Sequence, residues 1–265
     1  MAAKKKKIAK RVVGLVRNKK HKPAILAARA ADEVATEYSN AIPDSQLVVL
    51  AVPISAMESC AKDIFLHVPS ETVVTDVGSV KGPVVYALEK IFARKGKFVG
   101  SHPMAGSEKS GIDAARGNLF EKALCILTPT PSTDPEALRL VGKFWQQMGC
   151  KTCLCSAHDH DRLMATVSHV PHLLAACLMR TTRKAGEGFE DPIRFAGPSF
   201  RDMTRIAASP PELWADIVLA NRNAILRAAT VYVEQLEGVK ELLEKHDREA
   251  LLAFFRDSQA QREKL

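Results

Sequence analysis

The feature that most constrains the fold is a change of periodicity near residue 156 of this 265-residue chain. Before it, short β-branched runs alternate with helical stretches. Gln46 to Val52 (QLVVLAV), for example, is a continuous apolar run closed by Pro53. Such runs are typical of parallel strands buried on both faces. Beyond residue 156 only helical stretches follow. The pattern predicts an α/β domain built on a parallel sheet over residues 1–155, then an all-α domain over residues 156–265.

Individual elements follow from the same periodicity and from helix-start signals such as Asp134 before Pro135. The predicted strands are 11–16, 46–52, 72–75, a strand beginning at 97–99, 123–127 and 151–155. The predicted helices are 1–10 (the end of a basic helix), 22–31, 55–65, 83–94, 134–148, 158–184, 211–244 and 248–263.

A dinucleotide-binding domain of this kind opens with a strand and a G-x-G-x-x-G turn whose amides hold the pyrophosphate. The sequence has no such turn, since Gly14 stands alone in a predicted strand and Gly78 and Gly82 belong to another motif. We therefore expect a Rossmann-like domain without its first strand and glycine-rich loop. The natural protein is then expected to have roughly 30 further residues upstream. The alternative is a degenerate homologue with poor cofactor affinity.

Composition limits the function classes. The hydrophobic fraction of 46% and charged fraction of 26% indicate a globular protein. No apolar stretch reaches the roughly 18–20 residues of a membrane span, and no apolar segment follows Lys4 to Lys7 as in a secretory signal. We therefore expect a cytoplasmic protein whose six cysteines are free thiols. The net charge of +8 suits a nucleic-acid partner, or an enzyme that binds a dinucleotide and a dicarboxylate.

Two polar motifs follow predicted strands of the sheet. Thr75 to Lys81 (TDVGSVK) comes after one strand, and Gly100 to Met104 (GSHPM) follows the next. Both lie at the carboxyl edge, where ligands of such sheets bind. Ser79 can donate to a substrate oxygen, although taken alone a helix N-cap is the favoured interpretation. His102, held by the proline that follows it, can face the same crevice, but a lone histidine is more often structural.

Two further motifs lie in the helical part. Ser168 to His172 (SHVPH) places two imidazoles on one side of a helix, and Pro171 inside it is expected to cost about 3 kcal/mol. Gly197 to Trp214 contains Arg201 and Arg205 on one helical face. An exposed charged face is the alternative interpretation for these arginines.

Together, TDVGSVK, GSHPMAGSEKSG, HDRLMATVSHVPHLLA and FRDMTRIAASPPELW resemble the successive motifs of the prephenate/arogenate dehydrogenase family. They occur in the family's order across roughly residues 11 to 225. The resemblance implies a dinucleotide-binding domain followed by a helical domain that forms a homodimer. It also implies an oxidative decarboxylation in tyrosine biosynthesis, in which hydride leaves C4 of a cyclohexadienyl ring for a nicotinamide cofactor.

The resemblance also implies roles for individual residues. His102 would accept the proton of the substrate hydroxyl, and Ser79 would orient His102 and that hydroxyl. Arg205 would bind a substrate carboxylate. The remaining assignments are His169, His172 and the gating acid Glu108 at the substrate, Asp161 and Trp214 as structural members, and Ala51, Val52, Pro53, Gly78 and Ser79 at the cofactor.

The sequence gives partial information on the choice between NAD and NADP. NAD-dependent enzymes of this fold place an acid at the end of the second strand. Here Val16 stands at that position, followed by Arg17, which could bind a 2′-phosphate. We expect NADP or NAD, with a preference for NADP or dual use. The choice between prephenate and arogenate, and any feedback by tyrosine, stay open.

Three other interpretations compete. Cys150, Cys153 and Cys155 with His158 and His160 resemble a metal cluster, but alternate side chains of a strand point apart, so no metal is expected. A basic nucleic-acid or scaffold protein rests on the lysine run alone, without an RNA-binding aromatic motif. A related hydroxyacid dehydrogenase conflicts with the S-H-P-M-A-G and T-R-I-A segments. We therefore expect a small-molecule substrate and neither a nucleic acid nor a membrane partner.

Overall fold

The computed structural model describes residues 1–93, 96–106, 111–186, 188 and 191–264. Within them a five-stranded sheet has the order β3-β4-β5-β6-β7, and β1 pairs in parallel with β2 in a separate two-stranded sheet. The strands are β1 (Val13–Leu15), β2 (Glu33–Ala35), β3 (Leu47–Leu50), β4 (Val73–Asp76), β5 (Lys97–Pro103), β6 (Leu124–Thr128) and β7 (Lys151–Leu154). We call the part from α1 to β7 the sheet half, and the part from α7 onward the helical half.

The larger sheet is mixed, whereas a fully parallel sheet was predicted. β3, β4 and β5 are parallel, but β6 runs antiparallel to β5, with Ser101 opposite Leu127 and His102 opposite Ile126. A parallel neighbour needs a crossover connection, usually through an α-helix. Between β5 and β6 the described residues contain only the short 3-10 helix η2 (Ile112–Ala114). The predicted parallel sheet is therefore parallel except at the β5–β6 pair.

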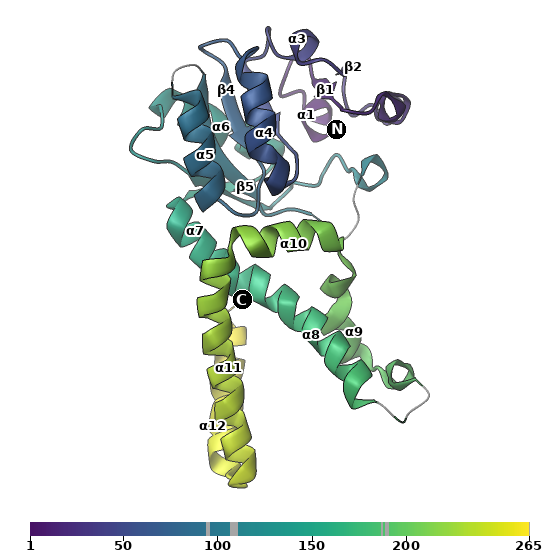
Figure 1. Cartoon of the computed structure of the whole chain (residues 1–265), viewed down its shortest axis with the longest axis vertical. Coiled ribbons are helices and arrows are strands. Elements are labelled where there is room, and N and C mark those ends of the chain that lie inside the picture. The colour runs from purple at the N-terminus through teal and green to yellow at the C-terminus, as the bar shows by residue number, and fades with distance from the viewer. Residues whose placement is uncertain (94–95, 107–110, 187, 189–190, 265) are drawn as a thin grey trace.

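Helices cover both faces of the larger sheet (Figure 1). On β4, Val74 points to the core under α4 (Ile54–Phe65) and α5 (Gly82–Phe92). Its neighbour Val73 joins the opposite core, formed with α6 (Pro135–Met148) and α1 (Ala2–Lys5). The alternation of side chains along a strand explains this division. The smaller elements are η1 (Lys19–His21), α2 (Lys22–Ala27) and α3 (Tyr38–Ala41).

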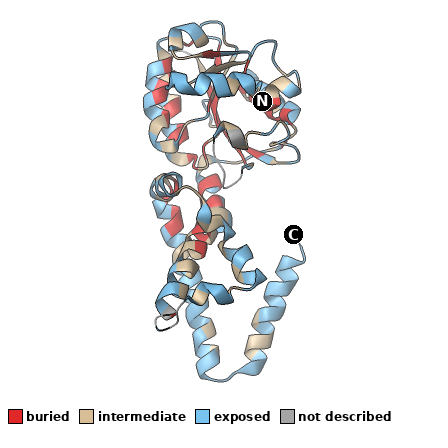
Figure 2. Cartoon of the chain, turned by 90° about the vertical axis from the view of Figure 1, so that its right-hand side faces the viewer, coloured by how far each residue is buried: buried red, intermediate tan, exposed pale blue. Residues whose placement is uncertain are grey.

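Every described element after β7 is helical, as the sequence predicted. The elements are α7 (Ala157–Met164), the π-helical segment η3 (Ala165–His169), α8 (Val170–Ala185), η4 (Pro192–Phe195), α9 (Pro198–Thr204), η5 (Arg205–Ala208), α10 (Pro211–Ala220), α11 (Arg222–Glu244) and α12 (Arg248–Arg262). A small core joins η3 and α8 to α11 through Ala165, Val170, Ala224 and Ile225. The distal parts of α11 and α12 form an almost fully exposed hairpin that extends away from the sheet half (Figure 2).

Several predicted boundaries differ from the structure. β2 and α3 were not predicted, and the helix predicted over 211–244 is interrupted at the buried Asn221. Pro171 does not stand in the interior of a regular α-helix. The π-helical segment η3 precedes it, so Pro171 stands in the first turn of α8, where a missing N–H leaves no hydrogen bond unmade.

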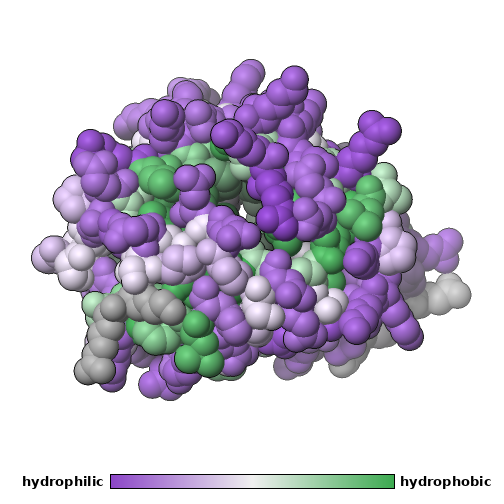
Figure 3. Space-filling model, turned by 90° about the horizontal axis from the view of Figure 1, so that it is seen from above, coloured by the Kyte–Doolittle hydropathy of each residue, from purple (hydrophilic) through white to green (hydrophobic). Residues whose placement is uncertain are grey.

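The face of the sheet half that points away from the helical half is mostly hydrophilic, with apolar patches between the polar side chains (Figure 3). Apolar atoms contribute much of the surface of any folded protein, so small apolar areas among polar side chains are ordinary. Among the described residues, none of the helices combines the length and the apolar character needed to cross a lipid bilayer.

Candidate active site

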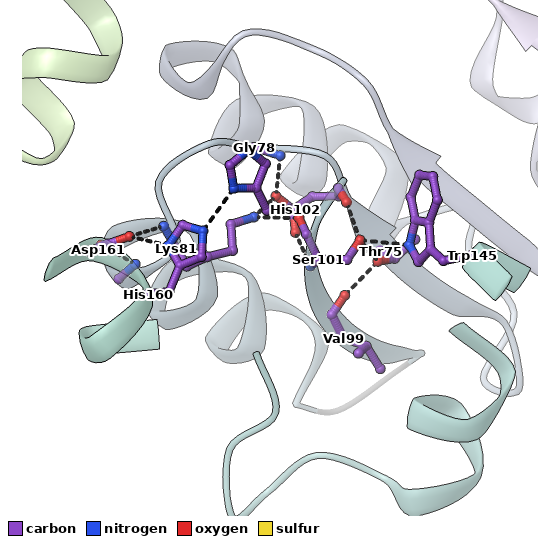
Figure 4. A network of polar contacts seen from close by, with 11 residues as sticks. Thr75, Gly78, Lys81, Val99, Ser101, His102, Trp145, His160 and Asp161 are labelled. Carbon is purple, nitrogen blue, oxygen red and sulfur yellow. Dashed lines mark hydrogen bonds and ion pairs between the residues drawn. The ribbon is translucent and has the colours of Figure 1, made fainter. Parts of the chain in front are cut away.

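The candidate site lies where the carboxyl ends of β4 and β5 meet α7, at the junction of the two halves (Figures 1 and 4). β4 ends at Asp76, and His102 is the next-to-last residue of β5. α5 packs against both β5 and α7 and so connects the halves. Ligands of open α/β sheets bind outside this edge, so the structure brings the predicted catalytic residue to the expected place.

His102 is the first member of a chain of three side chains (Figure 4). Its Nδ1 lies 2.9 Å from Nε2 of His160, and the two rings meet edge to face with their centroids 5.1 Å apart. Nδ1 of His160 lies 2.8 Å from Oδ1 of Asp161. His160 is fully buried and Asp161 nearly so, while His102 is half-buried. A histidine of the sheet half is thus connected to a carboxylate of the helical half.

The surroundings of His102 keep its ring neutral. Burial lowers the pKa of His102 to about 2, and the repulsion that a protonated His102 would meet from His160, Lys81 and His169 acts in the same direction. An imidazole with so low a pKa carries no proton on one of its nitrogens at neutral pH. His102 is therefore neutral, with a lone pair on one of its ring nitrogens.

Asp161 also caps α5 across the junction. Its Oδ1 accepts the backbone N–H of Lys81 and its Oδ2 that of Gly82, both at 2.7 Å. A Cβ at Gly82 would meet Oδ2 of Asp161 at 2.9 Å, so glycine permits this close approach. The N-cap position of α5 is Lys81. The interpretation of Ser79 as the N-cap is therefore wrong, because the capping carboxylate comes from α7.

A buried ion pair supports the loop between β4 and α5. Lys81 and Asp76 are both fully buried, and Nζ of Lys81 forms a short ion pair with Oδ2 of Asp76. The ammonium also donates to the backbone carbonyl of Ser101 at 2.9 Å. Asp76 accepts the N–H of Gly78 at 2.8 Å and that of Ser101 at 3.0 Å. Burial is the main cause that lowers the pKa of Lys81, while Asp76 opposes the shift. These contacts hold the ends of β4 and β5 together.

The side chain of Ser101 extends this network to α6. Nε1–H of Trp145 donates to Oγ of Ser101 at 3.0 Å, and the hydroxyl of Thr75 donates to the carbonyl of Val99 at 2.7 Å. All four residues are buried (Figure 4). The polar groups behind the site are therefore satisfied within the protein, which stiffens the strand that carries His102.

His169, on η3, has a buried donor without a partner. Nδ2 of Asn221 donates to the carbonyl of Asp161 at 2.8 Å, which identifies this atom as the amide nitrogen, and it lies 3.1 Å from Nδ1 of His169. Nδ1 of His169 must then accept, so Nε2 carries the hydrogen. This Nε2 is buried and has no hydrogen-bond partner among the described residues. Burial is the main cause that lowers the pKa of His169 to about 4. A buried N–H without an acceptor suits a ligand oxygen.

His172 and Trp214 connect α8 to α10. Their rings stack with centroids 3.4 Å apart and an angle of 12° between the planes. Burial lowers the pKa of His172. α10 also packs against α4, where the hydroxyl of Ser55 forms a short hydrogen bond to Asp216. The predicted members His172 and Trp214 therefore lie in the layer that closes the junction between the halves.

The other predicted residues have the following places. Arg205 is exposed and begins η5, which packs against α8. Ser79 is half-buried in the loop after β4, and Gly78 is buried in the same loop. Arg17 is exposed after β1, and Ala51, Val52 and Pro53 connect β3 to α4. Glu108 lies outside the described residues.

Sequence reasoning missed His160, Lys81 and Asp76 as members of the site. Lys81 and Asp76 stood in the quoted motif TDVGSVK without a role, and His160 was considered only as a metal ligand. The available signal was the pair His160–Asp161, a histidine beside a carboxylate at the start of the helical half. Within the described ranges, no group of three or more His, Cys, Asp or Glu side chains is placed to hold a metal ion.

Comparisons with known proteins agree with this geometry. Residues 1–154 match the family model for the prephenate dehydrogenase nucleotide-binding domain, and residues 156–257 match its dimerization domain. The chain is 32% identical to prephenate dehydrogenase of Bacillus subtilis (100% of this chain, 72% of the relative) and 34% identical to cyclohexadienyl dehydrogenase of Zymomonas mobilis (87% and 79%).

A solved structure shows the same relationship. The prephenate dehydrogenase from A. aeolicus, crystallised with hydroxyphenyl propionate and NAD+, superposes with a TM-score of 0.91 at 31% identity, covering 99% of this chain and 92% of that one. The predicted fold class and the resemblance to this family are confirmed, and the nucleic-acid and scaffold alternatives are not favoured. This chain belongs to the prephenate dehydrogenase family.

Proposed function

We propose that this chain catalyses the NAD(P)-dependent oxidative decarboxylation of prephenate or arogenate to 4-hydroxyphenylpyruvate or tyrosine, a step of tyrosine biosynthesis. Its family and the names of its relatives support this proposal. The observation that carries it is the neutral His102 at the carboxyl edge of β5, connected through His160 to the carboxylate of Asp161.

The reaction needs a base and a well-placed ring. The proton of the substrate's 4-hydroxyl passes to His102, and the C4–H electron pair leaves as hydride. The bond from the ring to its carboxylate breaks, carbon dioxide departs, and the electrons of that bond complete the aromatic ring. The C4 oxygen, left as a phenolate, takes the proton back from His102. The nicotinamide supplies the hydride acceptor when it is bound. Because aromatisation drives the step, the protein chiefly contributes the base and the placement. Ser79, half-buried in the loop after β4, is assigned to orient the hydroxyl.

Three groups of the helical half are assigned to the rest of the substrate. Arg205 provides a guanidinium, whose planar geometry suits a bidentate contact to a carboxylate. The Nε2–H of His169, which has no partner in the described part of the chain, supplies a buried donor for a substrate oxygen. His172, whose ring position is set by stacking on Trp214, is assigned to the far end of the substrate. Asp161 and Trp214 are assigned structural roles.

The cofactor is assigned to the segments that follow parallel strands, where ligands of such sheets bind. The Ala51–Pro53 segment and Gly78 follow β3 and β4 of the larger sheet, and Arg17 follows β1 of the two-stranded sheet. A Cβ at Gly78 would meet Oδ2 of Asp76 at 2.9 Å and Cε of Met57 at 3.0 Å, so this turn leaves room for backbone only. The exposed cation of Arg17 suits a 2′-phosphate, which favours NADP or dual use over NAD alone.

The test is a turnover assay of the protein with each pairing of prephenate or arogenate with NAD or NADP. Reduced nicotinamide is followed by absorbance, and the aromatic product by chromatography. Binding of 4-hydroxyphenylpropionate, measured by calorimetry, reports on the substrate site without a need for the cofactor. Turnover of neither substrate, together with no binding of the analogue, would overturn the proposal.

Replacing Arg205 by Ala is expected to raise KM for the substrate far more than it lowers kcat, because the guanidinium makes a contact present in both ground and transition states. A charge-assisted bidentate contact of about 2–3 kcal/mol corresponds to an increase of roughly 30- to 150-fold. Steady-state kinetics with the varied dicarboxylate measure it. The matched control is Arg201→Ala, which changes an exposed arginine one helical turn earlier. Equal KM values in the two variants would remove Arg205 from the site.

We also propose a cytoplasmic homodimer with a dinucleotide-binding domain over 1–155 and a dimerisation domain over 156–265. The match to a dimerization-domain model supports the assembly. So do the exposed apolar residues Leu226 and Val233, which lie seven residues apart on one side of α11. Light scattering is expected to give the mass of two chains. The variant Leu226→Glu/Val233→Glu is expected to give one chain, and an unchanged mass would show that this face is not the interface.

A further inference from the structure

The chain from His102 through His160 to Asp161 crosses the junction between the halves, and each of its hydrogen bonds has a definite direction. The carboxylate of Asp161 can only accept, and it already receives the backbone N–H groups of Lys81 and Gly82. The hydrogen between His160 and Asp161 therefore resides on Nδ1 of His160. The carboxylate of Asp161 therefore sets the direction of the hydrogen bond from His160.

The other nitrogen of His160, Nε2, sets the direction of the hydrogen bond to His102. His160 is completely buried, with 0% of its surface accessible to solvent. A cationic ring there would lose its hydration, and its one carboxylate partner, Asp161, is already shared with two backbone amides. A neutral His160 has its hydrogen on Nδ1 and a lone pair on Nε2. Because Nε2 of His160 lies 2.9 Å from Nδ1 of His102, His102 must donate from Nδ1.

The tautomer of His102 determines the state of its other ring nitrogen, Nε2. With its hydrogen on Nδ1, neutral His102 has its lone pair on Nε2, the nitrogen that takes no part in the hydrogen bonds linking His102, His160 and Asp161. We propose that His160 and Asp161 are positioning residues that fix His102 in its Nδ1–H tautomer, so that Nε2 is the atom that accepts the proton of the substrate hydroxyl. This proposal rests on the proposed function for the identity of the proton donor.

The arrangement does more than join β5 to α7. Once Nε2 has accepted a proton, His102 is a cation, and its Nδ1–H donates to a ring that is itself hydrogen-bonded to a carboxylate. The negative charge of Asp161 then stabilises the new cation through His160 without contacting it. Because His102 comes from β5 and the other two residues from α7, the base takes this form only when α7 is docked on the sheet half.

The experiment compares His160→Phe with His160→Gln. Phe preserves the ring shape but accepts no hydrogen bond, so His102 loses the partner that selects its tautomer. The expected result is a loss in kcat of about 10- to 100-fold, the scale for removing a partner that orients a functional histidine, with KM changed less than about twofold. Gln offers a carbonyl oxygen in place of Nε2 and is expected to recover most of kcat. A purely structural role would affect both variants alike.

The tautomer itself is measured by 15N NMR of the histidine-labelled protein without substrate. The expected signature is a protonated Nδ1 and a bare Nε2 on His102 in the wild type and in His160→Gln, and a mixture of tautomers in His160→Phe. A protonated Nε2 in the wild type would overturn the relay, even if turnover is observed. Undiminished kcat in a folded His160→Phe would do the same. Absence of turnover with either dicarboxylate rejects the proposed function instead and leaves the tautomer measurement valid.

Discussion

Replacing His102 by Asn is expected to lower kcat by ~10²–10⁴-fold, the range for loss of a general base. Asn preserves a polar side chain and can still donate to Nε2 of His160, so the hydrogen-bonded chain from His102 to Asp161 loses only its basic nitrogen. Cofactor affinity is expected to change little. Pre-steady-state kinetics measure the hydride step, and calorimetry measures the binding of NAD and NADP.

The matched control is His158→Asn, which changes an exposed histidine near the start of α7, two residues before His160. Its kcat is expected to stay within about twofold of the wild type, as for surface positions away from a site. If His102→Asn turns over as fast as this control, another group is the base and the assignment of His102 is wrong.

Replacing Lys81 by Met is expected to lower the free energy of unfolding by about 3–5 kcal/mol, because it leaves the fully buried carboxylate of Asp76 without its cation. Met has nearly the volume of the lysine stem, so the loss reflects charge and not a cavity. Urea denaturation measures it, followed by circular dichroism and by tryptophan fluorescence, to which Trp145 in the core of the sheet half contributes.

Two variants test the cause. Lys90→Met changes an exposed lysine of the same helix α5 and is expected to alter the free energy of unfolding by less than about 0.5 kcal/mol. The double variant Asp76→Asn/Lys81→Met removes both charges and is expected to be more stable than Lys81→Met alone. If the double variant is the less stable of the two, the cost does not come from an uncompensated carboxylate.

The sequence alone determined the order of the architecture. Strand periodicity up to Cys155 and helical periodicity after it follow from how side chains alternate along each element, which is local information. It also placed His102 at a strand end and, through four motifs, suggested the family that the comparisons confirm. It did not predict the direction of β6, because strand direction depends on the path of the connection through space.

The tertiary structure alone decided which groups surround the base. His102 and His160 are 58 residues apart in sequence, and Lys81 and Asp161 are 80 apart. No local pattern predicts that α7 caps α5, or that the lysine of TDVGSVK is buried against its own aspartate. These contacts depend on how the two halves dock. Their energy comes from hydrogen bonds made where water is excluded, and such an environment exists only once distant segments of the chain have packed together.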